Sequence, residues 1–220
     1  MNKWGKIGCT AALALLLIVL VVLLKTFDVA AIGPMETSVG FSHLNGAFAS
    51  LVGYSELWYR VTKLLGYGAF AVCGAFGALG AWQLITRKSL QKVDRKLLYL
   101  AGLYVVTILL YVLFEKVVIN ARPVLLPGET EPAASFPSTH TMLAIVVFGS
   151  AILLLPDYIA SRPLCLAAQI VACALLLVTV VGRAVSGVHW LTDILGGVMF
   201  GTLLLTAFEL LAESIPSKKR

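Results

Sequence analysis

Charged residues are scarce in this chain, at 13% of its 220 residues, whereas a soluble globular domain carries about a quarter. Hydrophobic residues make up 60% of the chain, and its mean hydropathy is +0.94. This composition excludes an ordinary soluble domain and predicts an integral membrane protein.

Acidic residues are fewer than basic ones, 11 against 17, which leaves a net charge of +6. Nucleic acid would suit such a charge, but no basic stripe with interleaved aromatics is present. Most basic residues instead flank hydrophobic segments, as expected at the cytoplasmic ends of membrane helices. They form four groups: Lys3 and Lys6; Arg87, Lys88, Lys92, Arg95 and Lys96; Arg162; and Lys218, Lys219 and Arg220. The expected partner is therefore the lipid bilayer, not nucleic acid.

Cysteines are few as well. Cys9, Cys73, Cys165 and Cys173 all lie inside apolar runs, and none has a CxxC or Cys/His spacing. This pattern predicts small core residues rather than disulfides or metal ligands.

Long hydrophobic runs are plentiful, by contrast. Six stretches are long enough to span a bilayer, for which a helix needs about 20 apolar residues: Ile7–Leu24, Leu64–Ile85, Leu97–Phe114, His140–Leu155, Leu164–Val181 and Trp190–Leu211. They predict an all-α, polytopic membrane protein with a single domain over residues 1–220. Because Lys3 and Lys6 precede the first run, a signal peptide is the alternative there; the length of the run and the lack of a clear A-x-A site favour a retained helix.

The segment Asp28–Lys63 is too polar to span the membrane. Apolar residues recur in it at helical spacing, and three aromatic residues that suit an interface follow: Phe41, Leu44, Phe48 and Leu51, then Tyr54, Trp58 and Tyr59. The pattern predicts one or two interfacial helices between the first two spans.

The basic groups predict that both termini are cytoplasmic, together with the loops after the second and fourth spans. The end of the third span, the start of the fourth, the end of the fifth and the start of the sixth then emerge on the outer face. Three polar clusters lie at these places, within residues 116–123, 137–140 and 183–193. Polar residues are costly at membrane depth, so these clusters are candidates for the functional site.

His189 and Asp193 lie four residues apart at the start of the sixth span, hence on one helix face. A carboxylate bonded to one ring nitrogen fixes the tautomer and leaves the other nitrogen free to attack. This pair predicts His189 as a nucleophile that Asp193 orients. The alternative is a structural histidine that caps the helix, with Asp193 charging its first turn.

Pro137-Ser138-Thr139-His140 opens the fourth span. A helix N-terminus offers unpaired N–H groups and the positive end of a dipole to an anion. Ser138 would cap this helix, bind the anion, or do both; capping alone is the simpler account of Ser138 and Thr139. His140 would lie within reach of a leaving oxygen as a general acid.

Lys116, Arg122 and Arg183 supply positive charge, which stabilises the negative charge on the oxygens of a phosphoryl group in transfer. Pro123 disfavours a helical conformation of Arg122, which suits a loop folded over a ligand. For Lys116 the alternative is a snorkelling residue at a helix end. Because these cations would repel a metal ion and no second carboxylate cluster is present, we expect chemistry without a metal or other cofactor.

The same residues resemble the signature of the type-2 phosphatidic acid phosphatase superfamily, the membrane lipid-phosphate phosphatases: KxxxxxxRP, PSGH and SRxxxxxHxxxD. The blocks read here Lys116-VVINA-Arg122-Pro123, Pro137-Ser138-Thr139-His140 and Gly182-Arg183-AVSGV-His189-WLT-Asp193. Three departures are present. The gap after Lys116 is one residue shorter, which would turn its side chain by about 100° on an unbroken helix. Thr139 replaces a glycine, and Gly182 replaces a serine.

The resemblance implies a phosphohistidine mechanism, in which His189 attacks phosphorus, His140 protonates the leaving group and water then releases phosphate. It also implies phosphate contacts from Lys116, Arg122, Ser138 and Arg183, assisted by the backbone N–H groups around Thr139 and His140.

The expected function is hydrolysis of a lipid phosphate or pyrophosphate, such as undecaprenyl pyrophosphate or phosphatidylglycerol phosphate, at the outer leaflet of a bacterial plasma membrane. A lipid phosphotransferase is an alternative, because the sequence does not separate water from a lipid as acceptor. A non-catalytic lipid-phosphate binder or transporter is another. The two site histidines and Asp193 disfavour the binder, because binding needs no nucleophile–acid pair.

Overall fold

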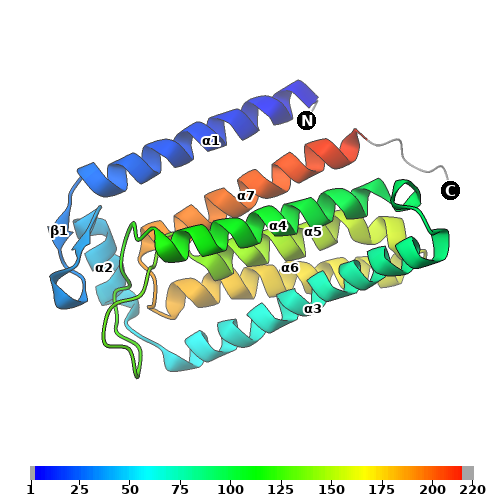
Figure 1. Ribbon diagram of the computed structural model, residues 1–220. Helices are drawn as coiled ribbons and strands as arrows, with labels where there is room; N and C mark the ends of the chain where they lie inside the picture. The colour runs from blue at the N-terminus through cyan, green and yellow to red at the C-terminus, as the bar shows by residue number, and fades with distance from the viewer. Residues whose placement is uncertain (1–2, 215–220) are drawn as a thin grey trace.

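Within the described residues, 3–214, this computed structural model contains six helices long and apolar enough to cross a membrane. They are α1 (Lys3–Thr26), α3 (Glu56–Arg87), α4 (Arg95–Lys116), α5 (Thr139–Tyr158), α6 (Arg162–Val185) and α7 (Leu191–Glu213). All six run along roughly the same axis, side by side (Figure 1). The prediction of an all-α, polytopic fold is confirmed.

A small subdomain lies between α1 and α3. Two short strands, β1 (Ala30–Ala31) and β2 (Ser38–Val39), pair antiparallel around the 3₁₀ turn η1 (Pro34–Glu36). They precede the short helix α2 (Ser42–Val52), which packs at the N-terminal end of α7. This is the helical segment predicted between the first two spans.

The second span begins earlier than the sequence predicts, at Glu56 instead of near Leu64. Ser55 is its N-cap and accepts a hydrogen bond from the Trp58 backbone N–H at 3.5 Å, while Glu56 places a negative charge in the first turn. Both features stabilise a helix N-terminus. The residues that follow are polar because one face of this turn borders a cavity rather than lipid, as described below.

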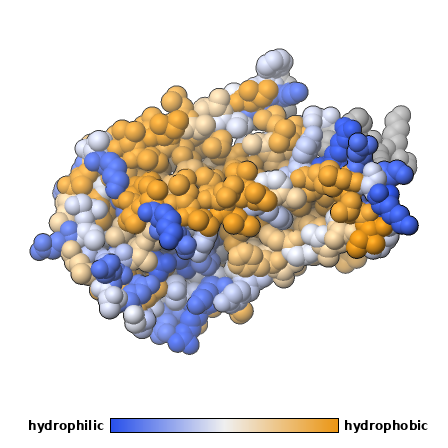
Figure 2. All heavy atoms as spheres, in the orientation of Figure 1, coloured by the Kyte–Doolittle hydropathy of each residue, from blue (hydrophilic) through white to orange (hydrophobic). Residues whose placement is uncertain are grey.

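Helix α5 is the centre of the bundle. About 61% of its apolar stretch is buried, against at most 28% in the other five spans. Its buried face packs with α4 and α7 in one apolar cluster and with α3 and α6 in another. The other helices therefore present apolar side chains outward, and Figure 2 shows hydrophobic residues over much of the visible face with hydrophilic residues mostly toward the ends.

The ends of the bundle differ in what they carry. The start of α1, the end of α7 and the turns after α3 and α5 lie at one end (Figure 1), and the 3₁₀ turn η2 (Leu90–Lys92) joins α3 to α4 there. Lys6 pairs with Glu209 at 2.7 Å and with Glu213 at this end. Lys218, Lys219 and Arg220 lie outside the described residues. The opposite end carries α2, the loop of residues 117–138 and the turn between α6 and α7. All three polar clusters meet there.

None of the four cysteines, all within residues 3–214, forms a disulfide. Cys165 is buried, but Cys9 and Cys173 are exposed on the outer surface of the bundle. The prediction that they are core residues is wrong for these two. An apolar thiol suits a lipid-facing position as well as a core position, so apolar neighbours in the sequence do not distinguish the two places.

Candidate active site

Backbone hydrogen bonds bring the three clusters together. The loop of residues 117–138 folds back on itself, because Arg122 donates its N–H to the Ala133 carbonyl at 3.0 Å and Ser135 donates to the Asn120 carbonyl at 2.8 Å. The N–H of Ser138 donates to the Asp193 carbonyl at 2.8 Å. The start of α5 is thereby tied to the start of α7.

His189 is buried in the turn between α6 and α7, and its ring is held at both nitrogens. Its Nε2 lies 2.8 Å from Nη2 of Arg183. Because a guanidinium can only donate, Nε2 is the acceptor and the ring proton is assigned to Nδ1. Burial, followed by the positive charge of Arg183, holds the pKa of His189 well below its usual range. The ring is therefore neutral at neutral pH, with its lone pair on Nε2.

Ser135 is the direct partner of the other ring nitrogen. Its Oγ lies 3.0 Å from Nδ1 of His189 and donates to Oδ2 of Asp193 at 2.5 Å. The direct distance from Nδ1 to Oδ2 is 3.8 Å, which is too long for a hydrogen bond. Asp193 thus orients His189 through a serine, where the sequence predicts direct contact.

The reason lies in the local geometry of α7. Asp193 is in the first turn of this helix, and its Oδ2 accepts the backbone N–H of Trp190 at 2.9 Å. That bond satisfies an unpaired N–H of the helix terminus. It also turns the carboxylate toward its own helix, and Ser135 bridges the space to the ring.

Two cavities border the histidines. The smaller, of about 70 Å³, is lined by both His140 and His189, with Arg122, Ser135 and Thr139 among its other walls. The larger, of about 430 Å³, is lined by α3, α4 and α5 together with His140, Arg122 and Arg183. The two predicted catalytic histidines therefore face a common small space that adjoins a larger one.

Both guanidinium groups retain unused donors. Arg183 is 1% exposed, lies with Cζ 5.6 Å from the Tyr59 ring centroid, and donates weakly from Nη1 to Oγ1 of Thr62 at 3.5 Å. Arg122 pairs at 3.5 Å with Glu129. The buried Nε atoms of both arginines lack hydrogen-bond partners among the described residues. Buried donors of this kind are costly unless they are paired, which indicates an anionic ligand.

The N-terminus of α5 opens on the same space. Ser138 occupies the N-cap position, but its side chain makes no capping bond; its Oγ lies 2.9 Å from Oγ1 of Thr141. Ser138 lines neither cavity, whereas Thr139 lines both. Met142 donates to the Ser138 carbonyl, so the N–H groups of residues 139–141 precede the bonded part of the helix. Such unpaired N–H groups at a helix N-terminus can bind an anion.

Lys116 is not brought into this cluster. It is the last residue of α4, its side chain is exposed, and it lines neither cavity. Glu115, the residue before it, lines the smaller cavity instead. The short gap before Arg122 thus has the effect expected for a helix that turns by about 100° per residue.

Gly182, the third departure from the signature, has a packing reason. A Cβ atom at this position would lie 2.6 Å from Cγ2 of Thr62 and 3.0 Å from Cε3 of Trp58. The absence of a side chain lets α3 approach α6 closely. That approach places Thr62 and Tyr59 against Arg183.

Several site residues have no motif that would reveal them. Ser135 lies in a loop with no recognisable pattern, and Asn120 donates to Asp193 from the same loop at 3.4 Å. Asn45 of α2 is fully buried; its Nδ2 donates to Oγ1 of Thr192 at 3.0 Å, and its Oδ1 accepts the Thr192 N–H at 3.2 Å. It holds the first turn of α7 in place. A lone asparagine inside an apolar helical pattern is the signal that points to it.

No group of three His, Cys, Asp or Glu side chains within residues 3–214 is arranged to hold a metal ion. The positive side chains that face the cavities favour an anion there instead.

Comparisons with known proteins agree with the sequence signature. Residues 96–213, more than half of the chain, match the model of the PAP2 superfamily. The fold is similar to that in the "crystal structure of the first transmembrane PAP2 type phosphatidylglycerolphosphate phosphatase from Bacillus subtilis", with a TM-score of 0.67 and 22% sequence identity. The similarity covers 96% of this chain and 98% of that one. No curated protein matches the sequence.

Proposed function

Because this chain belongs to the PAP2 superfamily, we propose that it is a membrane phosphatase that hydrolyses a lipid phosphate or pyrophosphate through a phosphohistidine intermediate. One observation carries the proposal: His189 and His140 line the same cavity of about 70 Å³, together with Arg122. A nucleophile, a proton donor and a cation around one small space are what phosphoryl transfer through histidine needs.

In the first half-reaction, Nε2 of His189 attacks phosphorus and a P–N bond forms. The bond from phosphorus to the lipid-side oxygen breaks, and this oxygen takes a proton from His140. In the present structure Nη2 of Arg183 donates to Nε2 of His189 at 2.8 Å. This N–H must turn to a phosphate oxygen before the Nε2 lone pair can attack phosphorus. The proton on Nδ1 stays in place, held by Ser135 and, through it, Asp193.

In the second half-reaction, His140 takes a proton from a water molecule. The resulting hydroxide attacks phosphorus, the P–N bond breaks and inorganic phosphate leaves. The donors of Arg122 and Arg183 and the N–H groups at the start of α5 stabilise the charge on the phosphate oxygens in both halves. This set of donors supports chemistry without a metal, because it supplies the positive charge that a metal ion would otherwise provide.

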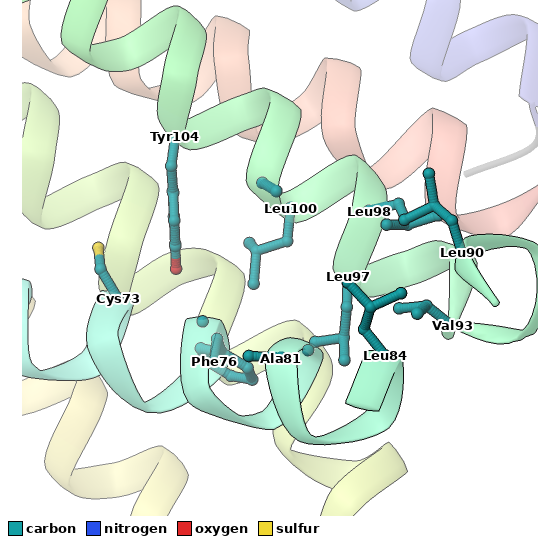
Figure 3. Close-up of a pocket in the computed structure, with 13 residues that line it drawn as sticks. Cys73, Phe76, Ala81, Leu84, Leu90, Val93, Leu97, Leu98, Leu100 and Tyr104 are labelled. Carbon is teal, nitrogen blue, oxygen red and sulfur yellow. The ribbon is translucent and has the colours of Figure 1, made fainter. Parts of the chain in front are cut away.

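A lipid substrate is supported by the cavities along α3 and α4. The larger charged cavity extends along these helices as far as Phe70 and Thr107. A separate apolar cavity of about 260 Å³ begins one helical turn further along each helix, at Cys73 and Tyr104. Figure 3 shows Cys73 and Phe76 of α3 facing Tyr104 and Leu100 of α4 across it. With the phosphate bound at the charged end of the larger cavity, the apolar tail of a lipid would lie between α3 and α4, along the apolar cavity.

The outer leaflet is supported by the distribution of basic residues. The segment of residues 87–96, which joins α3 to α4 at the end of the bundle opposite the site, is rich in lysine and arginine. The positive-inside rule assigns that end to the cytoplasm, which puts the site on the outer face of a plasma membrane and the start of α1 inside.

The test uses the full-length protein purified in detergent and a panel of lipid monophosphates and pyrophosphates in the presence of EDTA. Undecaprenyl pyrophosphate and phosphatidylglycerol phosphate are the first substrates to examine. We expect release of inorganic phosphate that is abolished in His189→Ala. His43→Ala is the matched control, because His43 is an exposed histidine of α2 paired with Asp28 outside the cavities. Undiminished release by His189→Ala would refute the assigned nucleophile.

A second arm distinguishes the acceptor. Water as acceptor gives phosphate in proportion to the lipid consumed, whereas a phosphotransferase consumes the lipid phosphate and produces a new phosphorylated lipid without free phosphate. Binding of the lipid with neither product would favour a non-catalytic binder.

A further inference from the structure

Four residues of α3 turn one face of that helix toward the site. Tyr59, Thr62, Lys63 and Gly66 follow helical spacing. Tyr59 and Thr62 contact Arg183. A Cβ atom at Gly66 would lie 3.5 Å from Nε2 of His140. Lys63 lies between these contacts in the sequence, on the same face, and lines the cavity of about 430 Å³.

The wall of this cavity is strongly positive. Lys63, Arg122 and Arg183 all line it, and among the described residues that form the wall there is no aspartate or glutamate. Three cations around one largely apolar space repel one another, and the buried Arg183 also loses hydration there, whereas Lys63 is exposed. A bound anion relieves both costs.

Lys63 itself has no counter-ion among the residues that the structure describes. Two other lysines on the spanning helices do have close partners: Lys6 pairs with Glu209 at 2.7 Å, and Lys96 pairs with Asp157 at 2.7 Å. Within residues 3–214, the exposed side chain of Lys63 makes neither a hydrogen bond nor an ion pair. Its ammonium is therefore available to a ligand in the cavity that it lines.

We propose that the ammonium of Lys63 binds a non-bridging oxygen of the substrate phosphate, the role that the sequence signature gives to Lys116. The inference rests on the proposed function and deepens it. An ammonium is a point charge with three donors on a flexible stem, so it can reach a phosphate from α3 although the signature expects the lysine on α4. Lys63 of α3 thus supplies the positive charge that Lys116 does not bring to the cavity, because the spacing between Lys116 and Arg122 is one residue short.

A further consequence concerns the substrate. His140 lines both cavities, whereas His189 lines only the smaller of the two and Lys63 only the larger. A pyrophosphate offers a second phosphate group to the larger cavity, and a monophosphate does not. Loss of the Lys63 charge should therefore weaken the binding of a lipid pyrophosphate more than the binding of the matching lipid monophosphate.

The experiment measures binding of inorganic phosphate and pyrophosphate to the purified full-length protein by calorimetry, and KM for a lipid monophosphate and pyrophosphate with the same chain. Lys63→Met keeps the length of the side chain and removes its charge. We expect binding of both inorganic anions to weaken by about ten- to a hundred-fold, the range for a lost charge-assisted hydrogen bond. Lys63→Arg should restore most of it. The KM should rise more for the lipid pyrophosphate.

Arg60→Met is the matched control, because Arg60 is a cation of the same helix that pairs with Glu56 at 2.6 Å and lines neither cavity. It should bind phosphate within about two-fold of the wild type, well inside the effect of a charged contact. Lys116→Met is the rival arm. Wild-type phosphate affinity in Lys63→Met overturns the proposal, as does a larger loss in Lys116→Met or a wild type that binds neither anion. The wild type could fail to hydrolyse any lipid phosphate while Lys63→Met still weakens anion binding. That outcome would refute the proposed function but support the Lys63 site.

Discussion

The hydroxyl of Ser135 lies 3.0 Å from Nδ1 of His189. This contact joins a loop residue to the predicted nucleophile, and the same hydroxyl donates to Asp193. Because the hydroxyl donates to the Asp193 carboxylate, its oxygen is left to accept the Nδ1–H of His189, and the carboxylate thereby stabilises the proton on Nδ1. The tautomer of His189 that Arg183 favours is therefore also stabilised by a residue that lies in none of the three clusters.

Replacing Ser135 with alanine should lower kcat more than it changes KM. The hydroxyl holds the nucleophile, and its loss leaves the buried Nδ1–H without an acceptor. A lost buried hydrogen bond of about 1–3 kcal/mol corresponds to roughly a ten- to hundred-fold lower kcat. Phosphate release from the lipid substrate provides the measurement. Ser135→Thr, which keeps the hydroxyl, should recover part of the rate.

Ser50→Ala serves as the control for this prediction, because the Ser50 hydroxyl of α2 bonds only to the carbonyl one turn earlier. Equal kcat values for Ser135→Ala and the wild type would mean that Asp193 reaches His189 without the serine.

Replacing Gly187 with alanine should both destabilise the protein and reduce its activity. Gly187 has a φ of +68°, and a Cβ atom there would lie 1.8 Å from the Gly53 carbonyl oxygen. The left-handed conformation alone costs a non-glycine residue about 1–2 kcal/mol, and the clash must displace the turn that carries His189. Thermal unfolding in detergent and phosphate release measure the two effects.

Gly74→Ala is the matched control for this substitution, since a Cβ atom on that helical glycine meets nothing within 4 Å. Its melting temperature should equal or exceed that of the wild type, because alanine favours a helix by up to about 1 kcal/mol. A Gly187→Ala variant that melts with the wild type would show that the turn adapts.

Acidification should destabilise the wild type through His189. Its pKa is lowered in the folded state by burial and by Arg183, while in the unfolded chain it is about 6.5. The unfolded state therefore binds more protons as the pH falls below about 6.5, so this contribution to stability is present at neutral pH and is lost toward lower pH. The melting temperature should fall more steeply with pH in the wild type than in His189→Gln. Parallel curves for the two proteins would contradict the lowered pKa.

Much of the fold follows from composition and periodicity. Each span is recognised from a run of apolar residues long enough to cross a bilayer, and the grouping of basic residues predicts that the three clusters lie at one end. The start of α3 is missed because Tyr59, Thr62 and Lys63 make its first turns polar. A hydropathy pattern does not distinguish a helix face that borders a charged cavity from a segment that lies on the membrane.

The site follows from the sequence only where a motif has a fixed spacing on one element or turn. Arg183, His189 and Asp193 belong to one short stretch, so their proximity is nearly a consequence of local geometry. The role of Lys116 is different, because it depends on how far α4 has turned when it ends. At the end of α4, Glu115 lines the smaller cavity and the side chain of Lys116 is exposed.

The sequence by itself determined that this is a membrane protein of six spanning helices, and it predicts which histidines, arginines and aspartate would take part in phosphoryl transfer. Hydrophobic length and short-range spacing carry that information along the chain. Only the tertiary structure decided that Ser135 stands between His189 and Asp193, and that Lys63 of α3 faces the cavity instead of Lys116. Those relationships arise from the packing of segments distant in the sequence, whose relative rotation no local pattern encodes.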